Sequence, residues 1–154
     1  MLYLVRHAKA GSRSEWRGDD RLRPLSKPGF AQSAAIADVL APLCAGGRLV
    51  SSSYLRCVQT LEPLALELGT TVELDDRLAE DHSFEGVLDL IETLPDGSAL
   101  SSHGDVIPET VSALARRGCE IVGEPDWRKG SIWVLTRDPS GEIVSAAAWP
   151  PPSR

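Results

Sequence analysis

The chain lacks a long hydrophobic run. Among its 154 residues, no apolar segment approaches the roughly 18 residues that a membrane-spanning helix needs. The pattern of a secretory signal peptide is also absent, because Met1 leads directly into the short apolar run Leu2–Val5. We therefore expect a cytoplasmic protein without a membrane partner.

Cysteine and histidine are scarce. The three cysteines, Cys44, Cys57 and Cys119, include no Cys-x-x-Cys pair, and an odd number fits neither a disulfide framework nor a zinc site. The three histidines show no His-Glu-x-x-His spacing. The sequence thus predicts no metal and no cofactor. We expect Cys57 to be a buried, inert thiol.

Basic residues are fewer than acidic ones. The chain has 16 lysines and arginines and 22 acidic residues, which gives a net charge of −6. This balance argues against broad nucleic-acid binding, although it allows a locally positive pocket. The hydrophobic fraction of 42% and the charged fraction of 25% are typical of a soluble globular protein. We expect one domain over residues 1–149 and a flexible tail over 150–154, which contains Pro150-Pro151-Pro152.

Apolar, strand-like runs alternate with segments of helical periodicity along the chain. Ser26 and Pro28 are typical of a helix start, and Gly69 is typical of a helix end. The expected strands are residues 2–6, 49–51, 70–74, 99–101, 132–136 and 143–148. The expected helices are 27–45, 55–69, 87–94 and 108–117. This alternation predicts an α/β fold, a three-layer α/β/α sandwich with a mostly parallel central sheet.

The first expected strand ends in Arg6-His7. Ligands of open α/β sheets bind beyond the carboxyl ends of the strands, so this pair lies where a ligand is expected. The planar guanidinium of an arginine matches phosphate oxygens, and a neutral imidazole is available as a nucleophile near neutral pH.

Three further polar segments also follow apolar runs. Ser51-Ser52-Ser53 precedes a helix whose first turn carries Arg56, and a helix N-terminus favours anions. His103-Gly104 follows another strand, and the glycine allows a close approach of backbone and ligand. Glu80-Asp81 forms a carboxylate cluster after the strand near residue 74.

The order of these four segments resembles that of the histidine phosphatase superfamily. The run Asp20–Ser26, followed by Gly29, resembles the small SixA-like branch of phosphohistidine phosphatases. The run Arg128–Leu135 is similar to the phosphatase domain that is fused to Nudix hydrolases in actinobacteria. The resemblance implies a phosphoglycerate mutase-like fold and a metal-independent phosphatase.

The resemblance also implies a role for each main residue. His7 would attack phosphorus and form a phosphohistidine that water then hydrolyses. Arg6, Arg56 and His103 would hold the phosphoryl group and stabilise its charge. Glu80 is the first candidate for the acid that protonates the leaving group.

Other residues complete the predicted site. Asp105 is the second candidate for the acid, and the third alternative is that neither residue acts as one, because the SixA-like branch can lack a clear acid. Gly104 would lie against the substrate. The side chains that we expect at the border of the pocket are Lys9, Ser12, Arg13 and Lys129.

One residue departs from the family pattern, because Ala8 stands where the family has a glycine after the histidine. If that position needs a glycine-only backbone conformation, Ala8 would be strained. The histidines also suggest a bell-shaped pH dependence of the rate, with His7 neutral as the nucleophile and His103 protonated as a donor.

The substrate class remains open at this point. The long insertion of the mutases is missing, which argues against a mutase and predicts an open pocket. Such a pocket favours phosphohistidine on a protein as the substrate. The alternatives are a nucleoside di- or triphosphate, as in nucleotide sanitising, a small phosphorylated metabolite, and a module that binds phosphate without turnover.

Overall fold

The N-terminal apolar run forms the strand that carries Arg6 and His7 at its end. The computed structural model describes residues 1–154, and β1 (Leu2–Arg6) is the fourth strand of a seven-stranded sheet. The strand order is β3-β2-β4-β1-β6-β7-β5. The other strands are β2 (Leu49–Ser51), β3 (Val72–Leu74), β4 (Ala99–Ser102), β5 (Glu120–Val122), β6 (Ile132–Arg137) and β7 (Ile143–Trp149).

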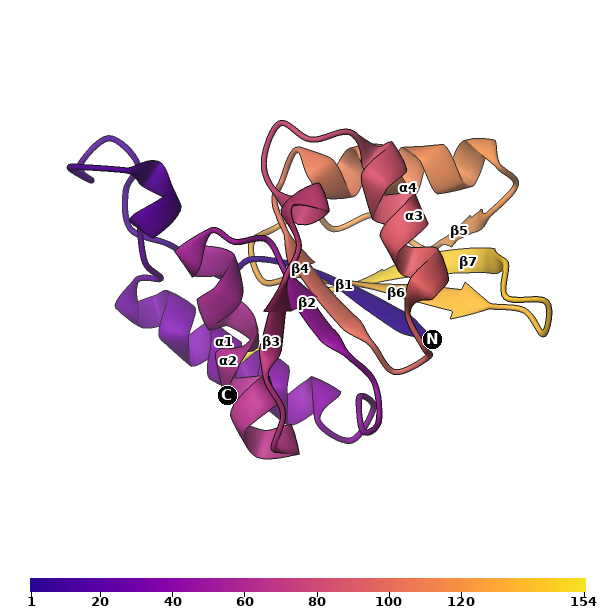
Figure 1. Ribbon diagram of the computed structural model, residues 1–154, viewed down its shortest axis with the longest axis horizontal. Helices are drawn as coiled ribbons and strands as arrows, with labels where there is room; N and C mark the ends of the chain where they lie inside the picture. Colours follow the sequence, from indigo (N-terminus) through magenta and orange to yellow (C-terminus); the bar gives the residue numbers. More distant parts are fainter.

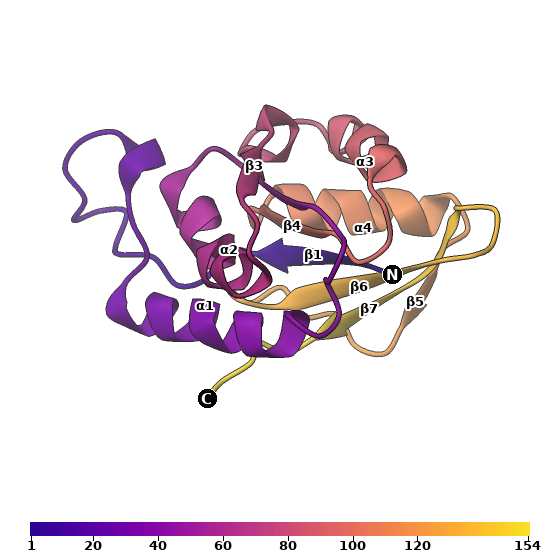
Figure 2. The ribbon, with the colours of Figure 1, turned by 60° about the horizontal axis from the view of Figure 1, so that its bottom comes forward.

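Four α-helices cover the two faces of this sheet (Figures 1 and 2). The helices α1 (Lys27–Leu40) and α2 (Leu55–Leu68) pack on one face. The helices α3 (Phe84–Thr93) and α4 (Val106–Arg116) pack on the other. All strands run in one direction except β6, which is antiparallel to both of its neighbours. The predicted three-layer sandwich with a mostly parallel sheet is therefore confirmed.

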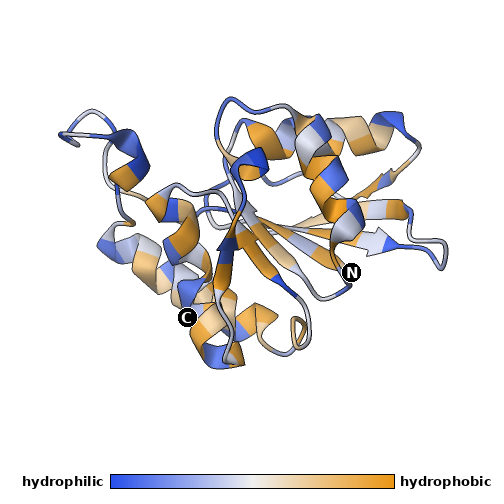
Figure 3. Cartoon of the chain, in the orientation of Figure 1, coloured by the Kyte–Doolittle hydropathy of each residue, from blue (hydrophilic) through white to orange (hydrophobic).

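The alternation of side chains along a strand divides β1 between two hydrophobic cores. Leu2 and Leu4 belong to the core under α3 and α4, whereas Tyr3 and Val5 belong to the core under α1 and α2. Burial on both faces explains why a central strand is continuously apolar. Figure 3 shows mainly hydrophobic central strands and a mainly hydrophilic loop before α1.

Local signals in the sequence fix several helix ends. The Ser26 hydroxyl accepts a hydrogen bond from the Gly29 N–H and caps α1. Gly69 ends α2 in the left-handed conformation, with a φ of 66°. The first helix is shorter than predicted. It ends at Leu40, two residues before Pro42, whose ring nitrogen carries no hydrogen to continue the ladder.

Some boundaries and one strand differ from the prediction. The helix expected from Val87 begins at Phe84, after the cap Ser83, and the helix expected from Pro108 begins at Val106. The edge strand β5 was not predicted, because three residues show too little periodicity to be recognised. None of these differences moves a segment that carries a predicted site residue.

The sheet topology places the polar strand ends next to one another. The strands β1 and β4 are parallel neighbours, with Arg6 opposite Ser102, and β2 pairs with the other side of β4. The chain continues from β1 to α1 on one face and from β4 to α4 on the other (Figure 2). Such a divergence opens a crevice at the carboxyl ends of the strands.

Residues 150–154 form no secondary structure, and the Arg154 guanidinium contacts the Asp38 carboxylate on α1 at 2.8 and 3.1 Å. None of the helices is both long enough and apolar enough to cross a membrane.

Candidate active site

The His7 side chain is 5% exposed and lies at the carboxyl end of β1. Its backbone N–H donates to the Ser102 carbonyl, which ties the end of β1 to the end of β4. The ring Nδ1 lies 2.7 Å from the Ala8 carbonyl oxygen. A carbonyl can only accept, so Nδ1 is the protonated nitrogen of the neutral ring. The lone pair of Nε2 is then available.

Burial lowers the pKa of His7 to about 3, opposed by the hydrogen bond to Ala8 and assisted by the nearby charges of Arg56 and Arg6. The imidazole is therefore neutral at pH 7. A neutral ring whose proton is held on Nδ1 is the form that can attack phosphorus through Nε2.

Ala8 is accommodated without strain. Its φ is not positive, since Asp81 is the only non-glycine residue with a positive φ. Its backbone N–H donates to the Thr60 hydroxyl at 2.9 Å. The position therefore does not require glycine.

Arg6 lies beside His7 and against the backbone of Gly104. A Cβ atom on Gly104 would lie 2.7 Å from the guanidinium carbon of Arg6, so the glycine creates the space for this side chain. One guanidinium nitrogen, Nη1, donates to the Trp127 carbonyl at 2.5 Å. The role of Gly104 thus includes room for Arg6 as well as a place in the cavity wall.

Arg56, in the first turn of α2, has a fully buried side chain. Its Nη2 lies 2.7 Å from the Glu80 Oε1 atom and 3.1 Å from the Asp20 Oδ2 atom. Its Nη1 donates to the Asp20 backbone carbonyl at 2.9 Å, and the guanidinium packs over the Tyr54 ring. A buried charge needs such partners, which hold the arginine in one orientation.

His103, at the end of β4, is 1% exposed. Its ring centroid lies 5.6 Å from that of His7. The Nε2 atom lies 2.9 Å from the Ser52 hydroxyl, and Nδ1 lies 3.3 Å from the Glu80 Oε1 atom. Burial lowers the pKa of His103 to about 3, and the charge of Arg56 acts in the same direction.

His103 is accordingly neutral at pH 7, and its contact with Glu80 joins a neutral imidazole to a carboxylate. The bell-shaped pH dependence expected from a protonated His103 is not supported, because burial lowers the pKa of this ring and leaves it neutral. Cys57 lies beside this ring and is fully buried, which raises the pKa of its thiol to about 12. Its burial is as the sequence predicted, and a raised pKa disfavours the reactive thiolate.

Glu80 occupies a central position among these donors. Its Oε1 atom contacts Arg56, His103 and, at 3.1 Å, the Nη2 atom of Arg13. The next residue, Asp81, has a φ of 64°, and its backbone N–H donates to the Asp105 carboxylate at 2.9 Å. Asp105 therefore stabilises the turn that points Glu80 toward the cavity.

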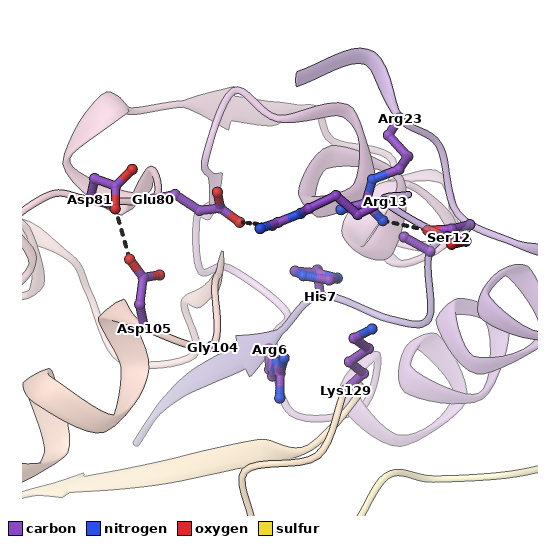
Figure 4. A pocket seen from close by; sticks show the side chains of 12 residues that line it. Arg6, His7, Ser12, Arg13, Arg23, Glu80, Asp81, Gly104, Asp105 and Lys129 are labelled. Carbon is purple, nitrogen blue, oxygen red and sulfur yellow. Dashed lines mark hydrogen bonds and ion pairs between the residues drawn. The ribbon is translucent and has the colours of Figure 1, made fainter. Parts of the chain in front are cut away.

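A cavity of about 470 Å³ opens in front of His7 (Figure 4), which is within the range of small-molecule sites. The residues that line it are Arg6, His7, Ala10, Gly11, Ser12, Arg13, Arg23, Glu80, Asp81, Gly104, Asp105 and Lys129. No group of three or more histidine, cysteine or acidic side chains is placed to hold a metal ion.

Most of the predicted site residues meet at this cavity. Arg56 and His103 do not line the cavity, because the Glu80 carboxylate contacts both side chains and lies between them and the cavity. Lys9 is exposed and is absent from the cavity wall, while its backbone N–H and carbonyl bond to Gln32 and Ser26. Lys129 does line it.

Arg23 and Asp20 were not predicted as site residues. Arg23 lines the cavity, and Asp20 bonds to Arg56 and Arg23. The only signal for them was the Asp20–Ser26 run, in which neither residue had an assigned role. In the same run, Gly29 has a packing reason, because a Cβ there would lie 1.8 Å from the Lys9 carbonyl oxygen.

The family profile described as Histidine phosphatase superfamily (branch 1) matches residues 2–86 of the chain. The chain belongs to the histidine phosphatase superfamily. This membership is the one that the sequence predicted.

Individual relatives agree with this membership. The chain is 37% identical to an 8-oxo-(d)GTP phosphatase of Mycolicibacterium smegmatis over 97% of its own length. It spans only about half of that curated relative, 48%.

Among solved structures, the SixA protein of Agrobacterium tumefaciens is 25% identical, with a TM-score of 0.67 and coverage of 88% of this chain and 90% of that one. A SixA protein histidine phosphatase complexed with tungstate is 22% identical, with a TM-score of 0.73 over 99% and 96% of the two chains, and it supports the phosphoglycerate mutase-like fold.

Proposed function

We propose that the protein hydrolyses a phosphate group through a covalent intermediate on His7 Nε2. The observation that carries this proposal is the hydrogen bond from His7 Nδ1 to the Ala8 carbonyl, which leaves Nε2 free to attack. Burial keeps the ring neutral, and the guanidinium of Arg6 lies beside it. This combination gives a nucleophile next to a donor for the negative charge of phosphate.

The phosphoryl group binds where Glu80 now meets its donors. Arg56 Nη2 donates to the Glu80 Oε1 atom and His103 Nδ1 lies 3.3 Å from the same atom, and a phosphoryl oxygen is the same kind of acceptor. On binding, the phosphate takes these donors and Glu80 turns toward the leaving group. Each charge-assisted hydrogen bond contributes about 1.5–3 kcal/mol, so two or three of them supply a large part of the catalysis.

The reaction has two displacements. In the first, Nε2 forms a bond to phosphorus while the bond from phosphorus to the leaving oxygen breaks. Glu80 takes up a proton from solvent once the phosphate has displaced it from Arg56 and His103, and it donates this proton to the leaving oxygen. In the second, Glu80 accepts a proton from a water molecule whose oxygen attacks phosphorus. The N–P bond breaks, and inorganic phosphate and neutral His7 are released.

The substrate that we propose first is the terminal phosphate of a nucleotide. This choice is supported by the relative from M. smegmatis, whose name specifies a nucleotide phosphatase and which is 37% identical over nearly the whole chain. The cavity also contains more cationic side chains than a single phosphate requires, since Arg13, Arg23 and Lys129 line it in addition to Arg6.

Phosphohistidine on a partner protein is the second candidate, and it was the first choice from the sequence. The 25% identity to the SixA protein of A. tumefaciens supports it. A protein-borne phosphate would leave Arg13 and Arg23 without a role in binding.

The cytoplasmic location expected from the sequence stays a prediction.

The test is release of phosphate from para-nitrophenyl phosphate in the presence of EDTA, measured for the wild type and His7→Ala. We expect wild-type turnover that EDTA does not reduce and a loss of about 10⁴-fold or more in the variant, because a nucleophile has no substitute in the site. Equal activity of the two proteins would contradict the proposal. A subsequent comparison of nucleotides with a phosphohistidine peptide distinguishes the two substrate candidates.

A further inference from the structure

The loop between β1 and α1 adds a second basic wall to the cavity. Arg13 and Arg23 both come from this loop and lie close together above His7 in Figure 4. They are joined through Asp20, whose Oδ1 atom is 2.9 Å from Arg23 Nε and 3.9 Å from Arg13 Nε. The other oxygen of Asp20 contacts Arg56. One carboxylate thus connects this wall to the residues proposed to bind the transferred phosphate.

Arg23 is positioned like a ligand-binding residue. Its side chain is only 6% exposed. Its Nε donates to Asp20 and its Nη1 to the Gly11 carbonyl, whereas its Nη2 forms no hydrogen bond in the structure. A buried guanidinium costs free energy unless its donors are satisfied. An arginine that lines a cavity with donors unused is therefore suited to bind an anion there.

The direction of the leaving group points to the same wall. In an in-line displacement, the leaving oxygen departs on the side opposite to the attacking His7. Glu80, the proposed acid, would contact that oxygen after it turns, and before it turns its Oε1 atom lies 3.1 Å from Arg13 Nη2. A group attached to the leaving oxygen is thus next to Arg13. The opposite wall carries Asp81 and Asp105, which repel an anion.

A fourth cationic side chain, that of Lys129, lines the same cavity, and so many positive charges favour a ligand with several negative charges. Burial lowers the pKa of its ammonium group, and the charges of Arg6 and Arg23 lower it further. Bound phosphate groups would offset this repulsion between cations.

We propose that Arg23 and Arg13 form a second anion subsite, which binds the phosphate adjacent to the one transferred to His7. The substrate then contains a phosphoanhydride, as in a nucleoside di- or triphosphate. The P–O bond that breaks joins two phosphates, and the subsite stabilises the negative charge that develops on the departing one. This inference rests on the proposed function and specifies its substrate class.

The test is binding of two non-reacting probes, inorganic phosphate and methylenebisphosphonate, measured by isothermal titration calorimetry. The variants are Arg23→Gln and Arg13→Gln, and Arg17→Gln is the matched control. Arg17 belongs to the same loop, is exposed and does not line the cavity. Because the bisphosphonate carries no base, the result does not depend on the preferred nucleobase.

We expect the wild type to bind the bisphosphonate at least about tenfold more tightly than phosphate, which corresponds to one charge-assisted hydrogen bond. Each of the two variants should lose about tenfold or more of its affinity for the bisphosphonate and less than about threefold for phosphate, and Arg17→Gln should lose neither.

Equal losses for both probes would overturn the inference, because Arg23 would then only support the loop. Equal affinities of the wild type for the two probes would overturn it as well. Arg13→Gln guards against misfolding, since its side chain is 67% exposed. Failure of the proposed function is recognised separately, by full activity of His7→Ala on para-nitrophenyl phosphate.

Discussion

Gly104→Ala tests whether the site depends on close packing between a strand end and Arg6. The new Cβ would lie 2.7 Å from the guanidinium carbon and the Nη2 atom of Arg6. Ordinary contacts between such atoms begin near about 3.5 Å. The guanidinium must therefore retreat by about 0.8 Å, which lengthens a hydrogen bond of about 2.8 Å to one of about 3.6 Å, and at that length it is broken.

The loss of one charge-assisted hydrogen bond to phosphate costs about 1.5–3 kcal/mol. We therefore expect kcat/KM for para-nitrophenyl phosphate to fall roughly 10- to 150-fold. Stability should change little, because the atom that must move is the end of a flexible side chain. The assay is steady-state kinetics together with thermal unfolding of the variant.

Gly86→Ala is the matched control, since Gly86 lies in α3 and does not line the cavity. Activity of Gly104→Ala within about twofold of the wild type, with a normal melting temperature, would refute the reasoning. Catalysis would then not depend on the position of the Arg6 guanidinium against Gly104. A loss of the same size in Gly86→Ala would refute it too, because the effect would then not be local.

Three further predictions follow from the same contacts. Gly29→Ala should lower the free energy of unfolding by about 1–3 kcal/mol, because its Cβ would meet the Lys9 carbonyl, which is rigid backbone; thermal unfolding measures this, and an unchanged Tm would contradict it. The pKa values of His7 and His103 are about 3 when folded and about 6.5 when unfolded, so the unfolded chain binds protons that the folded chain does not. The stability that the two neutral histidines contribute is fully present above pH 6.5 and is lost as the pH falls toward 3. The free energy of unfolding in urea should therefore be lower at pH 4 than at pH 7, and this difference should be smaller in His103→Asn. Glu80→Gln cannot donate a proton and should slow hydrolysis of phenyl phosphate about 10²-fold or more but that of para-nitrophenyl phosphate much less, whereas equal losses would argue against Glu80 as the acid.

The hydrophobic periodicity of the sequence was sufficient to predict the main helices and strands. The strand ending at Arg6 is continuously apolar because both of its faces are buried, and such runs are readily recognised. The edge strand β5 escaped prediction because it is short and partly exposed, and its pairing with β7 depends on contacts distant in sequence.

The candidate site was predictable where residues follow strands, because the topology brings the strand ends together. His7 and His103 could be paired on that ground, and their rings lie 5.6 Å apart. In the loop after β1, Ser12 and Arg13 were expected at the border of the pocket and do line it, whereas the contribution of Arg23 was not predicted. Whether Lys9 or Arg23 faces the cavity depends on the path of that loop, which Gly11, Asp20 and Gln32 fix through hydrogen bonds.

His7 was expected to be neutral and is neutral, whereas His103 was expected to be protonated and is neutral at pH 7. The pKa of a histidine depends on its burial, which the sequence does not give. Burial is the largest influence on the pKa of both rings. The tautomer of His7 depends on a single carbonyl, that of Ala8, whose direction only the folded backbone determines.

The most direct test of the account is a search for the phosphorylated enzyme. The wild type, His7→Ala and, as a control, His82→Ala are mixed with a γ-³²P-labelled nucleoside triphosphate and quenched within milliseconds. His82 is an exposed histidine that does not line the cavity. We predict a label that is labile in acid and stable in base, on the wild type and His82→Ala but not on His7→Ala. Turnover of the same nucleotide by the wild type without such a label, or a label that persists in His7→Ala, would contradict the account.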